Sequence, residues 1–192
     1  MIEVPKQTAA IFEIVSKGQF ISSNSSDEAI RKYYSVIEDG ENFDLLFNYF
    51  NAINFQLELG DEFYYFSRKE TKIDLERKIE QALKWIDIID FFKTFDNSFG
   101  SGFRFTPSEV LVRLNVDAEL KSKLEGLKRY SGGKDKFLDI IEKILEDLRK
   151  DRFVELENEI SNQFKVLASF KYLEQLIMTI NISAEIKDEI PE

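Results

Sequence analysis

The strongest constraint on the fold of this chain is a pattern that occurs twice, in which an amphipathic helix runs directly into two short β-strands. In the first copy, apolar residues at helical spacing predict a helix over residues 43–53. Alternating apolar and polar residues over 55–59 predict a strand. Gly60-Asp61 suits a two-residue turn before a second strand at 63–66.

The second copy begins with the most regular amphipathic pattern of the chain, over residues 137–148. Strands are predicted at 153–156 and 164–167, on either side of a polar turn. A helix followed by a two-stranded wing is the usual end of a winged helix-turn-helix domain. The repeat therefore predicts a mainly α chain with short β-hairpins, of the α+β class, built from tandem winged-helix domains.

The repeat also sets the expected domain boundaries. An N-terminal winged-helix domain is expected over residues 1–70 and a C-terminal one over 71–183, followed by an acidic tail at 184–192. Residues 73–95 form a long predicted helix with two apolar stripes. We expect this helix to be buried between elements, as a spine that joins both halves.

Local signals place several of the remaining elements. The small polar residues 22–26 are typical of a turn that also provides helix caps. Thr106-Pro-Ser-Glu109 combines an N-cap, a proline at the first helical position and the glutamate of a capping box, so a helix should begin there. We expect helix to continue over 121–130, and apolar spacing over 170–180 predicts a final helix.

The chain contains no cysteine and no histidine. Disulfides, Ser-His and Cys-His nucleophile systems and histidine-based zinc sites are therefore excluded. Glu155, Glu157 and Glu159 lie on and beside a predicted turn, where solvation explains them better than catalysis or metal binding. We expect no catalytic residues, no metal and no cofactor.

Gly132-Gly133-Lys134 has a limited similarity to a phosphate-binding loop. Lys128 stands where that motif requires its first glycine, and Asp135 stands where it requires serine or threonine. A nucleotide site is therefore not expected.

The formal net charge is −10, which disfavours a protein that simply coats DNA, because nonspecific DNA binding depends on lysine and arginine. The chain starts with no secretory signal and has no uninterrupted apolar stretch of about 18 residues. We therefore expect a soluble, cytoplasmic protein without membrane contact.

One basic stretch stands out against the acidic background. Within sixteen residues it has only two acids, Glu125 and Asp135, against the six cations Lys121, Lys123, Lys128, Arg129, Lys134 and Lys136. The stretch falls between the second and third helices of the predicted C-terminal domain, a corner that faces the DNA backbone in winged helices. Two interpretations stay open: a DNA contact, or a solvated helix and turn with local ion pairs.

The first predicted wing is a second candidate surface. Phe63, Tyr64, Tyr65 and Phe66 are consecutive aromatic residues, and a strand cannot bury both of its faces against one small core. One face is therefore a candidate for binding a partner chain, since aromatic residues are favoured in interfaces. The alternative is that the wing packs on the long helix of the same chain.

The chain resembles the winged-helix accessory subunits of bacterial condensins of the MukE/MksE type, which are related to the accessory subunit of the Wadjet plasmid-defence complex. The resemblance covers nearly all of the chain, and the run from Trp85 to Phe105 is most specific to the MksE branch. It rests on IFEIVSKGQFISSNS, NFQLELGDEFYYFSRKE, LERKIEQALKWIDIIDFFKTFDNSFGSGFRFTPSEV and FVELENEISNQFKVLASFKYLEQLIM.

This resemblance implies a non-catalytic subunit that forms a homodimer, largely through its N-terminal domain. The dimer is expected to bind the kleisin subunit, and through it the SMC ATPase, and to help hold DNA in a nucleoid-associated complex. The overall acidity of the chain departs from what a strong autonomous DNA binder would show, so we expect weak, salt-sensitive DNA contact confined to the basic stretch. The cellular role would be chromosome condensation and segregation, or plasmid defence.

A free-standing winged-helix transcriptional regulator is the alternative. Such proteins usually have a basic recognition helix, whereas residues 137–148 contain four acids and one lysine. This composition favours the condensin subunit over the regulator.

Overall fold

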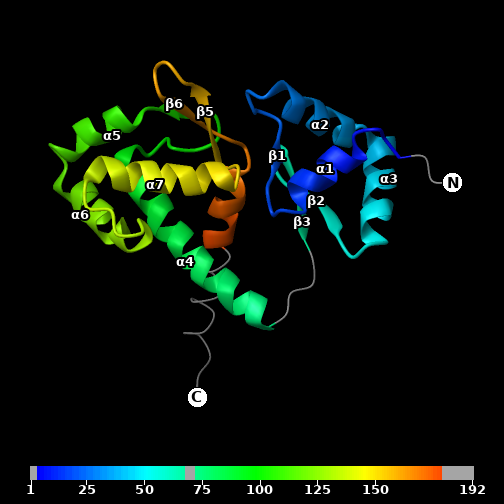
Figure 1. Cartoon of the computed structure of the whole chain (residues 1–192), viewed down its shortest axis with the longest axis horizontal. Coiled ribbons are helices and arrows are strands. Elements are labelled where there is room, and N and C mark those ends of the chain that lie inside the picture. The colour runs from blue at the N-terminus through cyan, green and yellow to red at the C-terminus, as the bar shows by residue number, and fades with distance from the viewer. Residues whose placement is uncertain (1–3, 68–71, 179–192) are drawn as a thin grey trace.

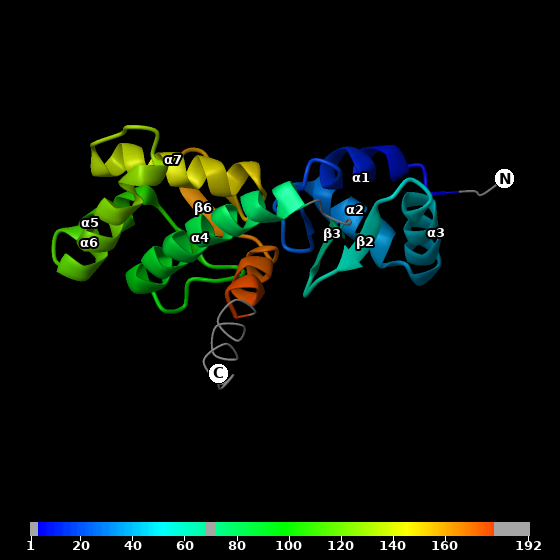
Figure 2. The same ribbon diagram turned by 90° about the horizontal axis from the view of Figure 1, so that it is seen from below.

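A computed structural model describes residues 4–67 and 72–178 of the chain. Figures 1 and 2 show the N-terminal half, residues 4–67, beside the C-terminal half, residues 72–178. Each half packs around a hydrophobic cluster of its own, but Phe20 and Phe63 of the N-terminal half belong to the cluster of the C-terminal half. Helices combined with small antiparallel sheets confirm the predicted α+β class.

The described N-terminal half packs its helices against a three-stranded antiparallel sheet with the strand order β1-β3-β2. Strands β2 and β3 form the predicted hairpin, with Leu57 opposite Phe66. Apolar helix residues such as Ile11, Ile37 and Leu46 are fully buried in the core. The elements are α1 (Thr8–Val15), β1 (Ile21–Ser22), α2 (Glu28–Glu38), α3 (Gly40–Asn51), β2 (Gln56–Leu59) and β3 (Phe63–Ser67).

The hairpin turn differs from the prediction by one residue. Gly60 is not a turn residue: its N–H donates to the Phe63 carbonyl at 2.8 Å, so Asp61 and Glu62 form the tip. Glu62 takes the left-handed conformation, with φ of 66°. Gly60 is required for a different reason, because a β-carbon there would lie 2.1 Å from the buried Phe63 ring.

The described C-terminal half repeats the order of helix, strand, helices and hairpin. Its strands form an antiparallel sheet in the order β4-β6-β5. The elements are α4 (Lys72–Phe95), β4 (Arg104–Phe105), α5 (Pro107–Leu114), α6 (Ala118–Leu127), the single 3₁₀ turn η1 (Lys128–Tyr130), α7 (Phe137–Lys150), β5 (Val154–Asn158), β6 (Gln163–Val166) and the helical residues 170–178. The expected continuation of this last helix to 180, and the predicted tail at 184–192, lie outside the described residues.

The helix predicted to begin at Thr106 is interrupted. Thr106 and Glu109 form the expected capping box, but α5 ends at Leu114. The side chain of Asp117 then accepts a hydrogen bond of 2.9 Å from the Leu120 N–H and begins α6 as a separate helix. An aspartate cap inside an apolar pattern is therefore enough to divide the predicted helix.

Helix α4 is only partly the buried spine that the sequence predicts. Trp85, Ile88 and Phe92 are buried in the core of the C-terminal half. One turn earlier, Ile79 and Leu83 are each 53% exposed. The expectation of a helix buried along its length is therefore wrong for this turn, because no described element covers it.

Candidate partner and nucleic-acid interface

The two halves meet at the serine-rich loop, residues 22–26, which the sequence indicates only as a turn. Asn24 makes the central contact, with the hairpin β5–β6 and the chain that follows it. Its Oδ1 accepts a hydrogen bond of 2.8 Å from the Ala168 N–H, and its Nδ2 donates to the Val166 carbonyl at 3.3 Å. The loop therefore fixes the second hairpin against the N-terminal half.

Glu155 of β5 is part of the same contact. It accepts hydrogen bonds from the Ser25 hydroxyl at 2.8 Å and from the Ser26 N–H at 2.6 Å. Only 18% of its side chain is exposed. The expectation that this carboxylate is merely solvated is wrong, because the serine-rich loop of the distant N-terminal half covers it.

Glu157 is bound in a similar way. Arg104 of β4 donates to both carboxylate oxygens, at 2.6 and 2.9 Å, and Lys165 Nζ lies 3.6 Å away. These hydrogen bonds from Arg104 hold the pKa of Glu157 below its usual range. Glu159 is exposed, as predicted. The polar side of the joint is thus a network of small polar and charged residues.

Aromatic rings form the other side of the joint. The ring of Phe20 lies 5.6 Å from those of Phe63 and Tyr65 in its own half. It also lies 5.0 Å from Phe153 and 5.2 Å from Tyr172 in the C-terminal half. Phe20 therefore connects the first hairpin to the core of the other half.

Of the four aromatic residues predicted to bind a partner, this packing buries two and leaves two partly exposed. Phe63 is fully buried and Tyr64 is 3% exposed, so the chain itself covers both side chains. Burial raises the pKa of Tyr64 to about 12, with smaller effects from Tyr34 and Glu38. Tyr65 and Phe66 are half-buried. Partner contact at this wing stays a prediction, and it now concerns Tyr65 and Phe66.

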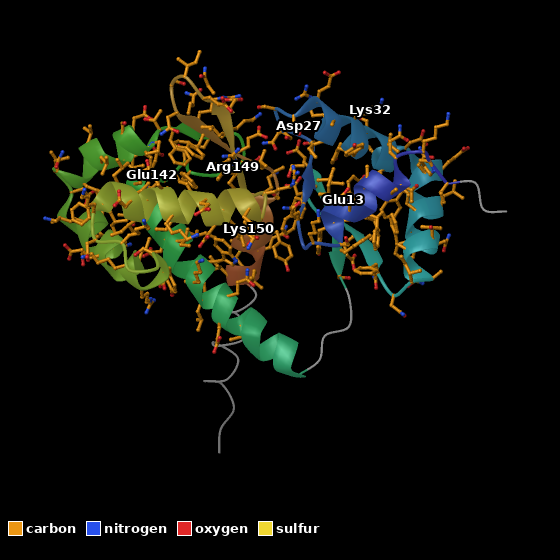
Figure 3. All side chains as sticks on the ribbon, in the orientation of Figure 1. Glu13, Asp27, Lys32, Glu142, Arg149 and Lys150 are labelled. Atoms are coloured by element: carbon orange, nitrogen blue, oxygen red, sulfur yellow. The ribbon has the colours of Figure 1, made fainter. Side chains whose placement is uncertain are left out.

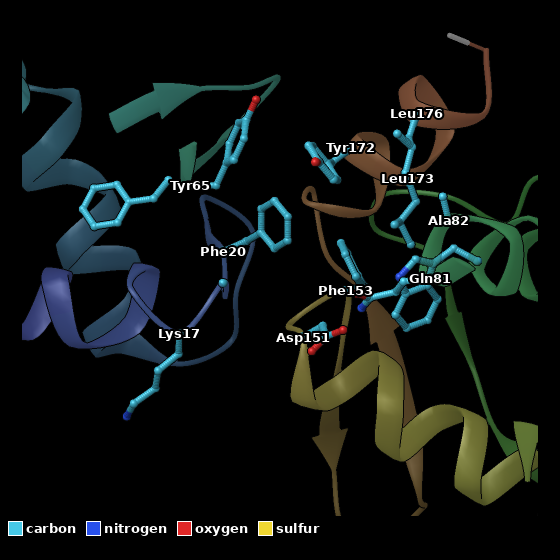
Figure 4. Close-up of a pocket in the computed structure, with 13 residues that line it drawn as sticks. Lys17, Phe20, Tyr65, Gln81, Ala82, Asp151, Phe153, Tyr172, Leu173 and Leu176 are labelled. Carbon is cyan, nitrogen blue, oxygen red and sulfur yellow. The ribbon is translucent and has the colours of Figure 1, made fainter. Parts of the chain in front are cut away.

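Tyr65 and Phe66 line a pocket of about 300 Å³ where the halves meet (Figure 4). We call it the aromatic pocket. Its carboxylate is Asp151, the residue that follows α7. Burial raises the pKa of Asp151 above its ordinary value. The aromatic walls consist of Phe20, Tyr65, Phe66, Trp85, Phe153 and Tyr172.

Half of the predicted basic stretch is neutralised by neighbouring acids. These pairs are Lys123 with Asp90 at 2.9 Å and Glu119 at 3.1 Å, Lys128 with Asp135 at 3.3 Å, and Arg129 with Asp87. Asp87 and Asp90 come from α4, far away in the sequence. These three cations are therefore ion-paired, but only the pair of Lys123 with Glu119 has the i,i+4 spacing of a local helix pair.

The other three cations of the stretch lie at the corner before α7, where they could contact an anion. Lys121 places its Nζ 5.7 Å from the centre of the Phe137 ring. Lys134 and Lys136 are exposed, and neither forms an ion pair with a side chain that the structure describes, at residues 4–67 and 79–178. This smaller set, rather than all six residues, could contact an anion.

A second group of cations, which the sequence reasoning missed, lies at the opposite end of α7. Arg149 and Lys150 are exposed (Figure 3), and with Arg152 they line a cleft of about 640 Å³ between the halves. Between the two basic ends, the exposed face of α7 carries Glu142 and Glu146. The sequence signal was the presence of three cations within residues 149–152.

The described residues contain no group of three or more acids positioned to hold a metal ion. Of the helices that the structure describes, none combines the length and the apolar character needed to span a bilayer.

Comparison with known protein families decides the assignment. The sequence matches the family of condensin complex proteins named MksE over residues 6–177. The chain belongs to the MksE family. No curated protein matches the chain.

Membership of the MksE family makes this chain an accessory subunit of a condensin complex, which implies partner subunits. The match begins before α1 and ends within the helical residues 170–178. It therefore includes both halves of this MksE protein, the serine-rich loop and the aromatic pocket.

Proposed function

We propose that this MksE-family chain is a non-catalytic subunit that dimerises, binds a kleisin and, through the kleisin, joins an SMC ATPase. In this complex it helps to hold DNA, in the cytoplasm and in association with the nucleoid. The observation that supports the proposal is the family match along residues 6–177. The match runs through both halves and does not stop at one of them.

We also propose that each half is a winged-helix domain, with boundaries at residues 1–70 and 71–183. Both halves run from helix and short strand through further helices into a hairpin, and the sheet order β1-β3-β2 recurs as β4-β6-β5. The described C-terminal half has one additional α-helix before its hairpin, α6, and the helical residues 170–178 after it. By this comparison, α7 takes the place of a recognition helix.

DNA contact through α7 should be confined to its two ends. Glu142 and Glu146 on its exposed face would repel phosphates, and the net charge of −10 weakens any approach to DNA. Lys134 and Lys136 at one end, and Arg149 and Lys150 at the other, can each contact a phosphate without placing α7 in the major groove. Binding of this kind is weak and salt-sensitive. The acidic face also argues against a free-standing regulator that reads bases with α7.

Purification of the tagged chain from its native host tests the proposal. A kleisin and an SMC protein should co-purify, and absence of both from a purification that retains the folded chain would refute it. The neighbouring genes distinguish the two cellular roles: kleisin and SMC genes alone favour chromosome maintenance, whereas an added gene for a topoisomerase-like nuclease favours plasmid defence.

A further inference from the structure

The aromatic pocket contains a carboxylate that lacks a partner. Among the side chains that the structure describes, at residues 4–67 and 79–178, none donates a hydrogen bond to the Asp151 carboxylate or forms an ion pair with it. Asp147, one turn earlier on α7, is paired with Lys84 Nζ at 2.5 Å and with Lys143 Nζ at 3.0 Å. Of these two acids, only Asp147 is ion-paired, by Lys84 of α4 and Lys143 of α7, whereas Asp151 at the end of α7 lines the pocket without such a partner.

The charges around Asp151 do not replace a direct partner. Lys150 and Lys84 act on it only at a distance, and burial, with a smaller effect from Asp147, outweighs them, so the pKa of Asp151 is raised. Lys17 lies on the opposite rim, where its Nζ is bound to Glu13 Oε1 at 3.1 Å. A partly buried, unpaired carboxylate is unfavourable in the free protein, and a cation that reached it would gain from this.

The walls of the pocket have the complementary chemistry for a cation on an apolar stem. Tyr65 and Tyr172 have their ring centres 5.1 Å apart (Figure 4). Trp85 and Phe153 have theirs 5.4 Å apart. Aromatic faces attract cations and bury methylene groups. A volume of about 300 Å³ lies at the small end of ligand pockets and suits one long side chain.

We propose that the aromatic pocket receives an arginine side chain from an extended segment of a partner protein. The stem lies against the rings, and the guanidinium pairs with the Asp151 carboxylate. Arginine fits better than lysine, because its planar group stacks on aromatic faces and donates two parallel hydrogen bonds to a carboxylate. Only the identity of the partner rests on the proposed function: if the chain acts in a condensin, a condensin subunit supplies the segment.

Trp85 makes the test direct, since it is the only tryptophan of the chain and lines the pocket. The full chain is titrated with N-acetyl-arginine amide, and the fluorescence of Trp85 is followed. N-acetyl-citrulline amide has nearly the same shape without the charge, and N-acetyl-norleucine amide has a purely apolar side chain on the same backbone. Arginine should produce a saturable change and bind about tenfold or more tightly than either control.

Two variants test whether the preference for arginine depends on Asp151. Asp151→Asn keeps the shape of the residue and should abolish the preference for arginine over citrulline. Glu142→Gln removes an exposed acid elsewhere on α7 and should leave that preference unchanged. Equal binding of norleucine and arginine, or no saturable change with any probe, would overturn the proposal. The titration of the unmodified chain does not depend on the variants, and neither experiment depends on co-purification with condensin subunits.

Discussion

Asn24 Oδ1 accepts a hydrogen bond of 2.8 Å from the backbone N–H of Ala168, a residue 144 positions further along the chain. This contact joins the serine-rich loop of the N-terminal half to the end of the second hairpin. An amide side chain that satisfies a distant backbone group determines how two parts of a chain sit together.

Asn24→Ala should lower the free energy of unfolding by about 1–3 kcal/mol, because it leaves the Ala168 N–H without its partner in a partly buried site. Urea unfolding measures the change. Asn48→Ala, on the exposed surface of α3, is the matched control and should change stability by no more than about 0.5 kcal/mol. Equal losses in the two variants would contradict the role of Asn24 in the joint.

Gly60→Ala should destabilise the chain by about 1–3 kcal/mol, because the new methyl group overlaps the buried Phe63 ring. Gly126→Ala is the control: it lies inside α6, and apart from its chain neighbours and the backbone of that helix no atom lies within 4 Å of the added carbon. There alanine should stabilise by about 0.5–1 kcal/mol through its helix propensity. Thermal unfolding of both variants measures these opposite effects, and stabilisation by Gly60→Ala would refute the packing of Phe63.

Stability should fall as the pH rises from about 10 to about 12. The pKa of Tyr64 is raised from 10.0 to about 12 in the folded chain, so the unfolded state loses its proton first. The contribution is complete below the unfolded pKa and disappears as the pH passes the folded pKa. Tyr64→Phe should flatten this decline in urea unfolding at high pH, and an unchanged decline would contradict the burial of the hydroxyl.

Reversal of Lys134 and Lys136 to glutamate should weaken binding to a duplex at low salt. Each lost phosphate contact should also reduce the salt dependence by about one unit of the log–log slope. Fluorescence anisotropy with a labelled duplex measures both effects. Lys32→Glu, on the exposed surface of α2 (Figure 3), provides the comparison and should change affinity less.

The same double reversal should spare co-purification with the kleisin, which separates DNA contact from partner binding. Arg129→Glu should have a smaller effect on DNA than the double reversal, because Arg129 is already paired with Asp87. If Arg129→Glu alone weakened DNA binding as much as the double reversal, the division of the basic stretch would be wrong.

Features that depend on neighbouring residues could be predicted from the sequence. The capping box of Thr106 and Glu109 needs only residues three positions apart, and the hairpins follow from local alternation. The turn at Gly60 shows the limit of such reasoning. The glycine is locally consistent with a turn, but it is required by the Phe63 ring that lies against it.

The candidate sites were harder to predict because their chemistry depends on distant partners. The charge of Arg129 is neutralised by Asp87 on another helix, and Glu155 is covered by Ser25 and Ser26 from the other half. No spacing rule connects these residues. The unpaired state of Asp151 is also invisible in the sequence, since it depends on which cations fail to reach the pocket.

Phe63 belongs to the N-terminal half by sequence and to the core of the C-terminal half by position. A chain cleaved between the halves would divide this core, leaving Phe20 and Phe63 on one fragment and Phe153 and Tyr172 on the other. Each fragment would then expose aromatic surface that only the other fragment covers. The two fragments should therefore reassociate without a covalent link, because their exposed aromatic surfaces are complementary.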